Sequence, residues 1–91
     1  MTLSKPLSKK TAKKAKEVYF SLPIKNENIS IFDMVKSLDI KSTQIHNYLT
    51  FLLNDARIIN RVKAERGSVY YYWRKNIKIN EFNQIIKKFM E

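Results

Sequence analysis

The chain has 91 residues, of which 44% are hydrophobic, and 18 lysines and arginines against eight aspartates and glutamates give it a net charge of +10. This length allows one domain with a modest core and excludes two. The lack of cysteine excludes disulfides and thiolate metal sites. So large a positive charge favours a polyanionic partner, of which nucleic acid is the commonest. The lack of cysteine and of an apolar secretory segment at the N-terminus leads us to expect a cytoplasmic protein. No apolar run approaches the roughly 18 residues that span a bilayer, so we expect no membrane partner.

The first predicted elements are a flexible basic arm over residues 1–7 and a helix over residues 8–22. Ser8 suits the N-cap of this helix, and Pro23 prevents the helix from continuing. Apolar residues recur along it at the three-and-four spacing of one helical face. Lysines crowd its first turns, at the positive end of the helix dipole, so we expect these turns to fray until an anion binds.

Two helices separated by a tight turn are predicted next, over residues 30–38 and 43–56. Ser30 and Asp33 make a pair like a capping box at the start of the first of them. The second has one apolar arc, and its opposite arc holds uncharged hydrogen-bonding side chains together with Phe51. These polar side chains are Thr43, Gln44, Asn47, Thr50 and Asn54. We interpret Phe51 as a contact to DNA sugars or to a partner chain.

A β-hairpin and a last helix complete the prediction. β-Branched and aromatic residues fill the two strands, residues 58–64 and 69–73. Gly67 is the only glycine of the chain and lies in the loop between them, where a positive φ is needed. Asn80 suits the N-cap of a helix that runs to the C-terminus. The apolar stripe of that helix consists of Phe82, Ile85, Ile86, Phe89 and Met90.

The order of these elements resembles that of winged helix-turn-helix proteins. The segments LDIKSTQIHNYL (38–49) and IINRVKAERGSVYYYW (58–73) carry the resemblance. The chain is similar to the arsenical-resistance, multiple-antibiotic-resistance and phenolic-acid repressors, and to small winged-helix proteins of archaeal viruses and plasmids. These families place a glycine before the first strand, whereas this chain reads NDARII there, so Arg57 must take the turn.

The resemblance implies a mainly α fold with a small β-hairpin. We expect a winged helix-turn-helix domain over residues 8–75, followed by an extra C-terminal helix within residues 76–91. In such a domain the helix predicted over residues 43–56 is the recognition helix, which enters the major groove of DNA.

Gln44 and Asn47 can each pair bidentately with adenine, and Thr43 can contact a phosphate or a thymine methyl group. Thr50 completes the predicted base-reading set, and a solvated helix face is the alternative interpretation. The predicted contacts to backbone phosphates are Lys36, Lys41, Lys63 and Arg66, joined by the N-terminal cluster of Lys9, Lys10, Lys13 and Lys14. For that cluster the alternative is a solubilising role.

The stripe of the last helix predicts a homodimer. A three-helix core with its hairpin is already a closed unit in winged-helix relatives, so the stripe would be left uncovered on a monomer. Two copies related by a two-fold axis would cover each other's stripe and set two recognition helices about 34 Å apart. The alternative is that the helix folds back on its own domain.

The resulting functional prediction is a sequence-specific binder of double-stranded DNA, either a transcriptional regulator or a DNA-maintenance factor of a small genome or mobile element. Two alternatives remain. One is a binder of single-stranded or non-specific nucleic acid that stacks bases on the aromatic run 70–73. The other is a winged-helix protein-interaction module in a replication or transcription complex. With no catalytic set and no phosphate-binding glycine loop, we expect no enzyme activity, cofactor, metal or small-molecule ligand.

Overall fold

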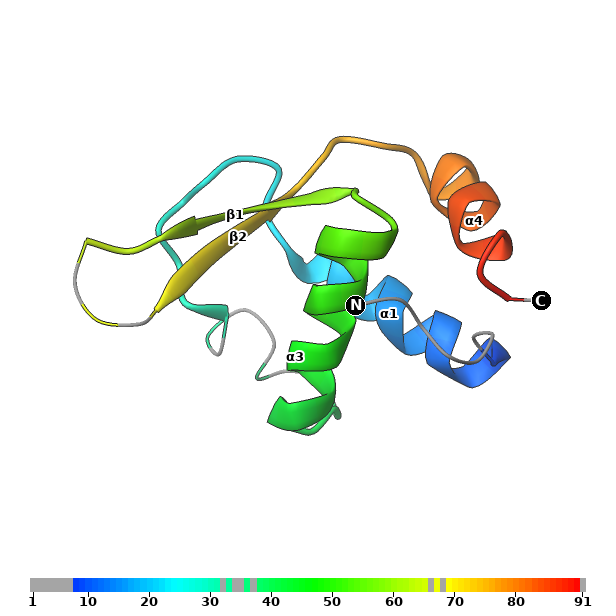
Figure 1. Cartoon of the computed structure of the whole chain (residues 1–91), viewed down its shortest axis with the longest axis horizontal. Helices are drawn as coiled ribbons and strands as arrows, with labels where there is room; N and C mark the ends of the chain where they lie inside the picture. Colours follow the sequence, from blue (N-terminus) through cyan, green and yellow to red (C-terminus); the bar gives the residue numbers. More distant parts are fainter. Residues whose placement is uncertain are drawn as a thin grey trace.

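The structure is a computed structural model of the whole chain, and it describes residues 8–31, 33, 36, 38–65, 67 and 69–90. Within these residues there are three α-helices, one π-helical turn and one two-stranded antiparallel sheet. In chain order they are α1 (Lys9–Ser21), α3 (Ser42–Thr50), η1 (Phe51–Asp55), β1 (Ile59–Lys63), β2 (Tyr70–Arg74) and α4 (Ile79–Lys87). The hairpin extends to one side of α3, and α1 and α4 lie on the other side (Figure 1). The predicted arm, residues 1–7, lies outside the described residues.

Helix α1 begins and ends as its sequence predicts. The Ser8 hydroxyl oxygen accepts a hydrogen bond from the Thr11 amide at 3.1 Å, which satisfies one of the unpaired donors of the first turn. At the other end Leu22 is extended, with ψ at 147°, because the following Pro23 disfavours a helical conformation of the residue before it. Ala15 and Val18 turn toward the core and are fully buried.

The C-terminal end of α1 is tied to the end of the hairpin. The Arg74 side chain donates from Nε to the Leu22 carbonyl oxygen at 3.1 Å, and its guanidinium lies 5.1 Å from the centre of the Phe20 ring. The buried Tyr19 hydroxyl donates to the Lys75 carbonyl oxygen. Burial raises the pKa of the Tyr19 hydroxyl above its ordinary value, and the hydrogen bond and positive charge of Arg74 partly oppose this rise.

Between α1 and α3 the chain first runs beside the hairpin. Ser30 forms an isolated antiparallel bridge with Tyr71, a pairing that the sequence did not predict. Ile31 and Asp33 are helical and Lys36 lies in a turn, whereas the remaining residues of the predicted second helix, apart from Ser30 and Leu38, lie outside the described part of the chain.

The predicted third helix is present as α3 continued by the π-helical turn η1. In this turn the Ala56 amide bonds to the Phe51 carbonyl oxygen, five residues back. Arg57 then ends the helix with φ at 57°, and the Ile58 amide bonds to the Leu52 carbonyl oxygen. The prediction that Arg57 takes the turn usually given to glycine is confirmed.

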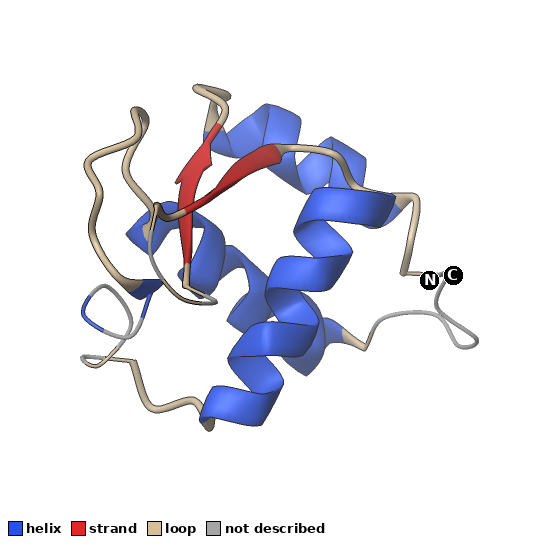
Figure 2. Cartoon of the chain, turned by 60° about the vertical axis from the view of Figure 1, so that its left-hand side comes forward, coloured by secondary structure: helices blue, strands red, loops and turns tan. Residues whose placement is uncertain are grey.

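The hairpin is also confirmed, within one residue at each end. Its register pairs Ile59 with Arg74 and Lys63 with Tyr70. Gly67 has φ at 75°, a conformation that glycine adopts without steric cost. The two strands form a short ribbon beside the helices (Figure 2).

The expectation of an uncovered stripe on the last helix is wrong. Phe82 is 1% and Ile86 3% exposed, and both belong to the same core cluster as Tyr19 and Leu52. The Phe82 ring lies 4.9 Å from the Tyr19 ring, centre to centre. The other stripe residues also pack on this core while remaining half-buried: Ile85, Phe89 and Met90.

The physical reason is that α1 offers an aromatic surface which α4 covers, so the helix folds back on its own domain. The homodimer stays a prediction, but it no longer has an exposed stripe for its interface. Helix α4 also begins earlier than predicted, with Lys78 rather than Asn80 as N-cap, and it ends at Lys87.

Candidate nucleic-acid interface

The solvent-facing side of α3 carries three of the four predicted base-reading residues. Thr43, Gln44 and Asn47 are exposed, whereas Ile45 and Leu49 on the opposite side are buried. The burial of the apolar side therefore holds the polar side toward solvent. Helix α3, which the structure describes throughout, contains no acidic residue that would repel a phosphate.

The two ends of α3 differ in what they offer a ligand. Lys41 is the N-cap residue; it is exposed and its side chain makes no capping hydrogen bond. Thr50 is half-buried, and its hydroxyl donates a 2.9 Å hydrogen bond to the His46 carbonyl oxygen. The N-terminal half of α3 is therefore the more accessible half, and Thr50 is the least accessible of the four.

Two basic residues lie on one face of the hairpin. Lys63 is exposed on β1, and Arg61, two residues before it, points to the same face. The Arg61 guanidinium lies over the Tyr70 ring, 4.4 Å from its centre. The sequence prediction missed Arg61, although strand alternation counted back from Lys63 would have found it. Arg66, the other predicted phosphate contact of the hairpin, lies outside the described residues.

This basic face of the hairpin is turned toward α3. A hollow of about 280 Å³ lies between them, and Ser42 and His46 line it from α3 while Val69 and Tyr70 line it from the hairpin. Because Lys63 is paired across the strands with Tyr70, the two residues share that face. From α3 the hollow is lined by Ser42, Ile45, His46 and Leu49, so it lies beside the exposed side of the helix and not on it.

The aromatic residues of β2 alternate between the core and the outer face of the hairpin. Tyr72 is 6% exposed and belongs to the core. Tyr71 and Trp73 point to the opposite face and are half-buried. These two are the aromatic residues of the strand that face away from the core.

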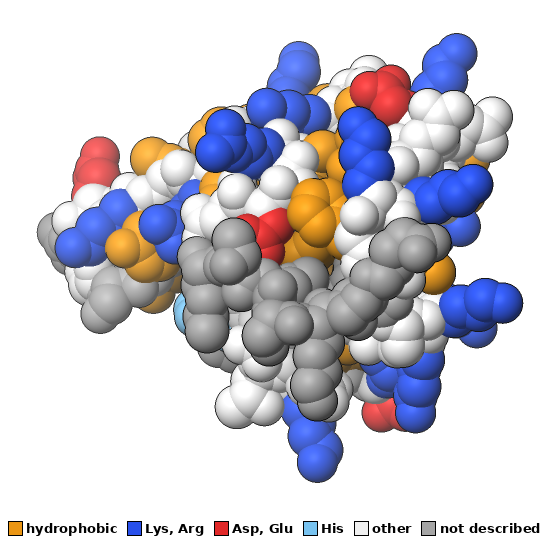
Figure 3. Space-filling view, turned by 45° about the vertical axis from the view of Figure 1, so that its right-hand side comes forward, with side chains coloured by type: hydrophobic (Ala, Val, Ile, Leu, Met, Phe, Trp, Pro, Cys, Tyr) orange, Lys and Arg blue, Asp and Glu red, His pale blue; other side chains and the backbone are white. Residues whose placement is uncertain are grey.

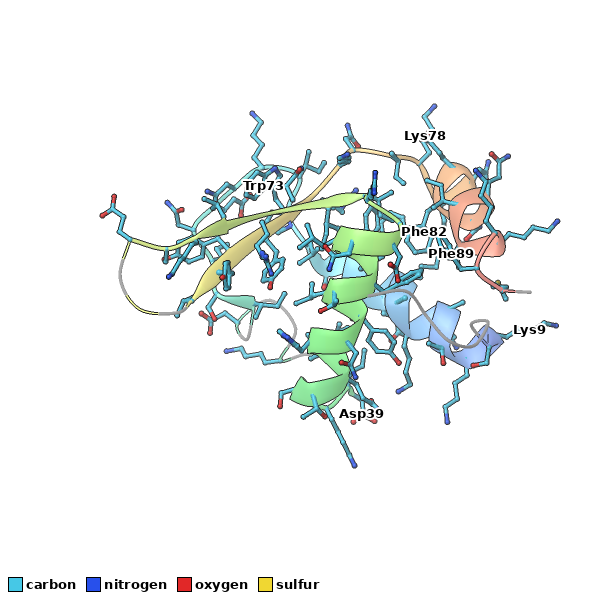
Figure 4. The ribbon with its side chains drawn as sticks, viewed as in Figure 1. Lys9, Asp39, Trp73, Lys78, Phe82 and Phe89 are labelled. Atoms are coloured by element: carbon cyan, nitrogen blue, oxygen red, sulfur yellow. The ribbon has the colours of Figure 1, made fainter. Side chains whose placement is uncertain are left out.

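The lysine cluster of α1 is not brought together with this surface. Lys9, Lys10 and Lys13 are exposed and Lys14 is half-buried. They occupy the first turns of α1, on the side of α3 away from the hairpin (Figure 1). Lys9 and Trp73 lie at opposite sides of the molecule (Figure 4). Lys36 is exposed in the turn that precedes α3.

Comparison of the chain with protein-family models, with curated proteins and with solved structures gives no match. Among the described residues there is no group of three or more histidine, cysteine, aspartate or glutamate side chains placed to hold a metal ion. None of the helices in the described segments is both long enough and apolar enough to cross a membrane.

Proposed function

We propose that the chain is a winged helix-turn-helix protein that binds double-stranded DNA, with α3 as the recognition helix and the β1–β2 hairpin as the wing. The observation that carries the proposal is the exposed face of α3. Its N-terminal half presents Thr43, Gln44 and Asn47 to solvent, with Lys41 at its start and no carboxylate along it. An α-helix of about 10–12 Å diameter fits a major groove about 12 Å wide.

The side chains of this face match the chemistry of base edges. Glutamine and asparagine donate and accept in one plane, which suits the N6 and N7 atoms of adenine. Lysine at the helix start would contact a phosphate, as would Lys63 and Arg61 on the wing. The net charge of +10 supports a polyanionic partner in general, and the uncharged polar face of α3 supports sequence readout in particular.

A regulator or DNA-maintenance factor is the role that such a protein would have, acting without catalysis or a bound cofactor. A second candidate function rests on the outer face of the hairpin, where Tyr71 and Trp73 are half-exposed. Unpaired bases would stack on such rings. This candidate predicts a preference for single strands, whereas the α3 proposal predicts a preference for duplex.

The test is a binding titration of the full chain with labelled duplex and with single-stranded DNA of random sequence, each at several salt concentrations. For duplex we expect log K to fall with log salt with a slope of about −4 to −7, as neutralising roughly five to eight phosphates requires. Tighter binding to the single strand would favour the second candidate. A slope near zero on both would contradict nucleic-acid binding.

A matched pair of lysine variants locates the site. Lys41→Gln removes the charge at the start of α3, and Lys78→Gln removes one at the start of α4. Asp39, two residues before Lys41, lies at one side of the molecule and Lys78 at the opposite side (Figure 4). We expect Lys41→Gln to make the salt slope shallower by about one and Lys78→Gln to leave it unchanged.

A further inference from the structure

A second basic surface lies away from the proposed DNA-binding side, in a groove between α1 and α4. The groove has a volume of about 640 Å³. Apolar residues form its floor and lysines form its rim. The apolar lining consists of Ala12 and Met90, which are partly exposed, and of Phe82 and Ile86, which are buried; the rim carries Lys9, Lys13, Lys16 and Lys87. Lysine and arginine side chains stand out from this part of the surface, with apolar side chains visible between them (Figure 3).

The rim lysines form an ordered row. Lys9, Lys13 and Lys16 are spaced i, i+4 and i+7, so they follow one face of α1 over about 10 Å. Lys87, in the last turn of α4, lines the same groove as this row. None of these four side chains forms an ion pair within the described part of the chain. Helix α1 has no acidic residue in its first turn, so the helix dipole adds to the positive potential there.

The combination of floor and rim identifies the chemistry of an occupant. A row of DNA phosphates would pair with the lysines but would leave the partly exposed Ala12 and Met90 in water. An amphipathic helix with carboxylates beside its apolar stripe would cover both at once. Its carboxylates at helical spacing would match the row on α1, and its apolar side chains would contact Met90 and Ala12.

Neither residues 1–7 nor the α-helices that the structure describes supply such a helix. Residues 1–7 contain one lysine and no aspartate or glutamate. The three described α-helices of a second copy do not have the required charge either: α1 has five lysines against one glutamate, α3 has no lysine, arginine or carboxylate, and α4 has one of each sign. We therefore propose that the α1–α4 groove binds an acidic amphipathic helix of a partner protein. The proposal assigns Lys9 and Lys13 to this partner rather than to DNA.

The test uses the isotope-labelled full chain and a synthetic helical peptide with leucines on one face and glutamates beside them. We expect backbone amide shifts at Ala12, Asn83 and Lys87, with the amides of Gln44 and Asn47 unmoved. Lys13→Gln combined with Lys16→Gln should weaken peptide binding roughly three- to tenfold, since two charge pairs are lost. The matched control, Lys41→Gln combined with Lys63→Gln, should leave peptide affinity unchanged.

Three control ligands decide between occupants. A peptide with serine in place of each leucine keeps the charge, and equal binding of it would overturn the proposal because the floor would then play no part. Duplex DNA that shifts the same α1 and α4 amides and displaces the peptide would assign the groove to nucleic acid. Vesicles containing phosphatidylserine that do the same would assign it to an anionic membrane surface. None of these outcomes decides whether α3 binds DNA, which the salt titration tests separately.

Discussion

The ring of Phe51 meets the ring of Phe89 edge-on, with 5.1 Å between their centres and an angle of 86° between their planes. Such a T-shaped pair is favourable because the positive edge of one ring faces the negative face of the other. Phe51 belongs to the turn that continues α3, and Phe89 follows α4. The contact therefore fixes the C-terminal segment against the far end of the proposed recognition helix. Phe82 and Phe89 both lie on the side of α4 that faces the body of the protein (Figure 4).

The packing of α4 predicts a large loss of stability on truncation. Phe82→Ala should lower the free energy of unfolding by about 3–5 kcal/mol, because it removes a fully buried ring and leaves a cavity. The control is Ile79→Ala on the same helix, whose side chain is 47% exposed and should change stability by under about 1 kcal/mol. Urea unfolding followed by circular dichroism measures both. Similar small losses in the two variants would show that α4 does not pack on α1.

The same packing predicts what Ile86→Asp does. Ile86 is 3% exposed, so the carboxylate would be buried without a partner and the domain should lose its cooperative fold. An exposed dimer stripe would instead give a folded monomer from a wild-type dimer. Sedimentation of both chains, with a thermal unfolding curve of each, separates these outcomes.

The helices and strands could be predicted from spacing because each pattern is local. Ser8 and Pro23 set the limits of α1, and Gly67 marks the hairpin loop. The surface on which α4 packs could not be predicted in this way. An apolar stripe shows that one face of a helix is buried, but not against which surface. The helical period likewise puts Phe51 among the solvent-facing residues. Its side chain is nevertheless only 4% exposed, because the ring of Phe89, far along the chain, packs against it.

Some features of the candidate site could also be predicted from the sequence, and others could not. The exposure of Gln44 and Asn47 follows from the helical period, so it could be predicted from the sequence. The hydrogen bond that the Thr50 hydroxyl donates to the His46 carbonyl oxygen, one helix turn back, could not be predicted from the pattern of polar residues. The groove between α1 and α4 could not be predicted from the sequence, because it forms only when the chain folds. In the sequence, α3 and the hairpin lie between these two helices.

Replacement of Arg57 by glycine is expected to stabilise the protein. Arg57 has φ at 57°, a conformation that costs an L-residue about 1–2 kcal/mol. Glycine removes this cost, but it lowers the free energy of unfolding by roughly 0.5–1 kcal/mol because it makes the unfolded chain more flexible. The net gain should be about 0.5–1 kcal/mol. The same change at Arg61, within β1, should destabilise instead, and denaturant titration of the two variants shows whether their effects have opposite signs.

Stability should fall at alkaline pH because of Tyr19. Burial raises the pKa of its hydroxyl above the ordinary value of 10.0. The folded state therefore holds this proton more tightly than the unfolded state. The resulting stabilisation is complete below pH 10 and is lost as the pH rises through the folded pKa. Ionisation also removes the hydrogen bond that Tyr19 donates to the Lys75 carbonyl oxygen.

Tyr19→Phe is the control for that pH dependence. It should be less stable than the wild type at pH 8, by about 0.5–1.5 kcal/mol for the missing hydrogen bond. Its free energy of unfolding should then decline less steeply between pH 9 and 11, because one ionising group is absent while the lysines are unchanged. Parallel pH profiles of the two proteins would show that Tyr19 does not titrate with folding.

The last prediction concerns base readout by α3. Gln44→Ala and Asn47→Ala should each weaken binding to a selected DNA site by about 1–3 kcal/mol, the value of one bidentate contact to a base edge. Both should leave binding to random duplex nearly unchanged, because that binding depends on phosphates. Asn54→Ala is the matched control, since Asn54 is also an exposed asparagine but lies in η1, at the far end of the helix. The measurement is a competition titration of each variant against the selected site and random duplex at one salt concentration. Equal losses on the two DNAs would mean that Gln44 and Asn47 only position the protein. A loss in Asn54→Ala as large as in Asn47→Ala would mean that the N-terminal half of α3 is not the part that enters the groove.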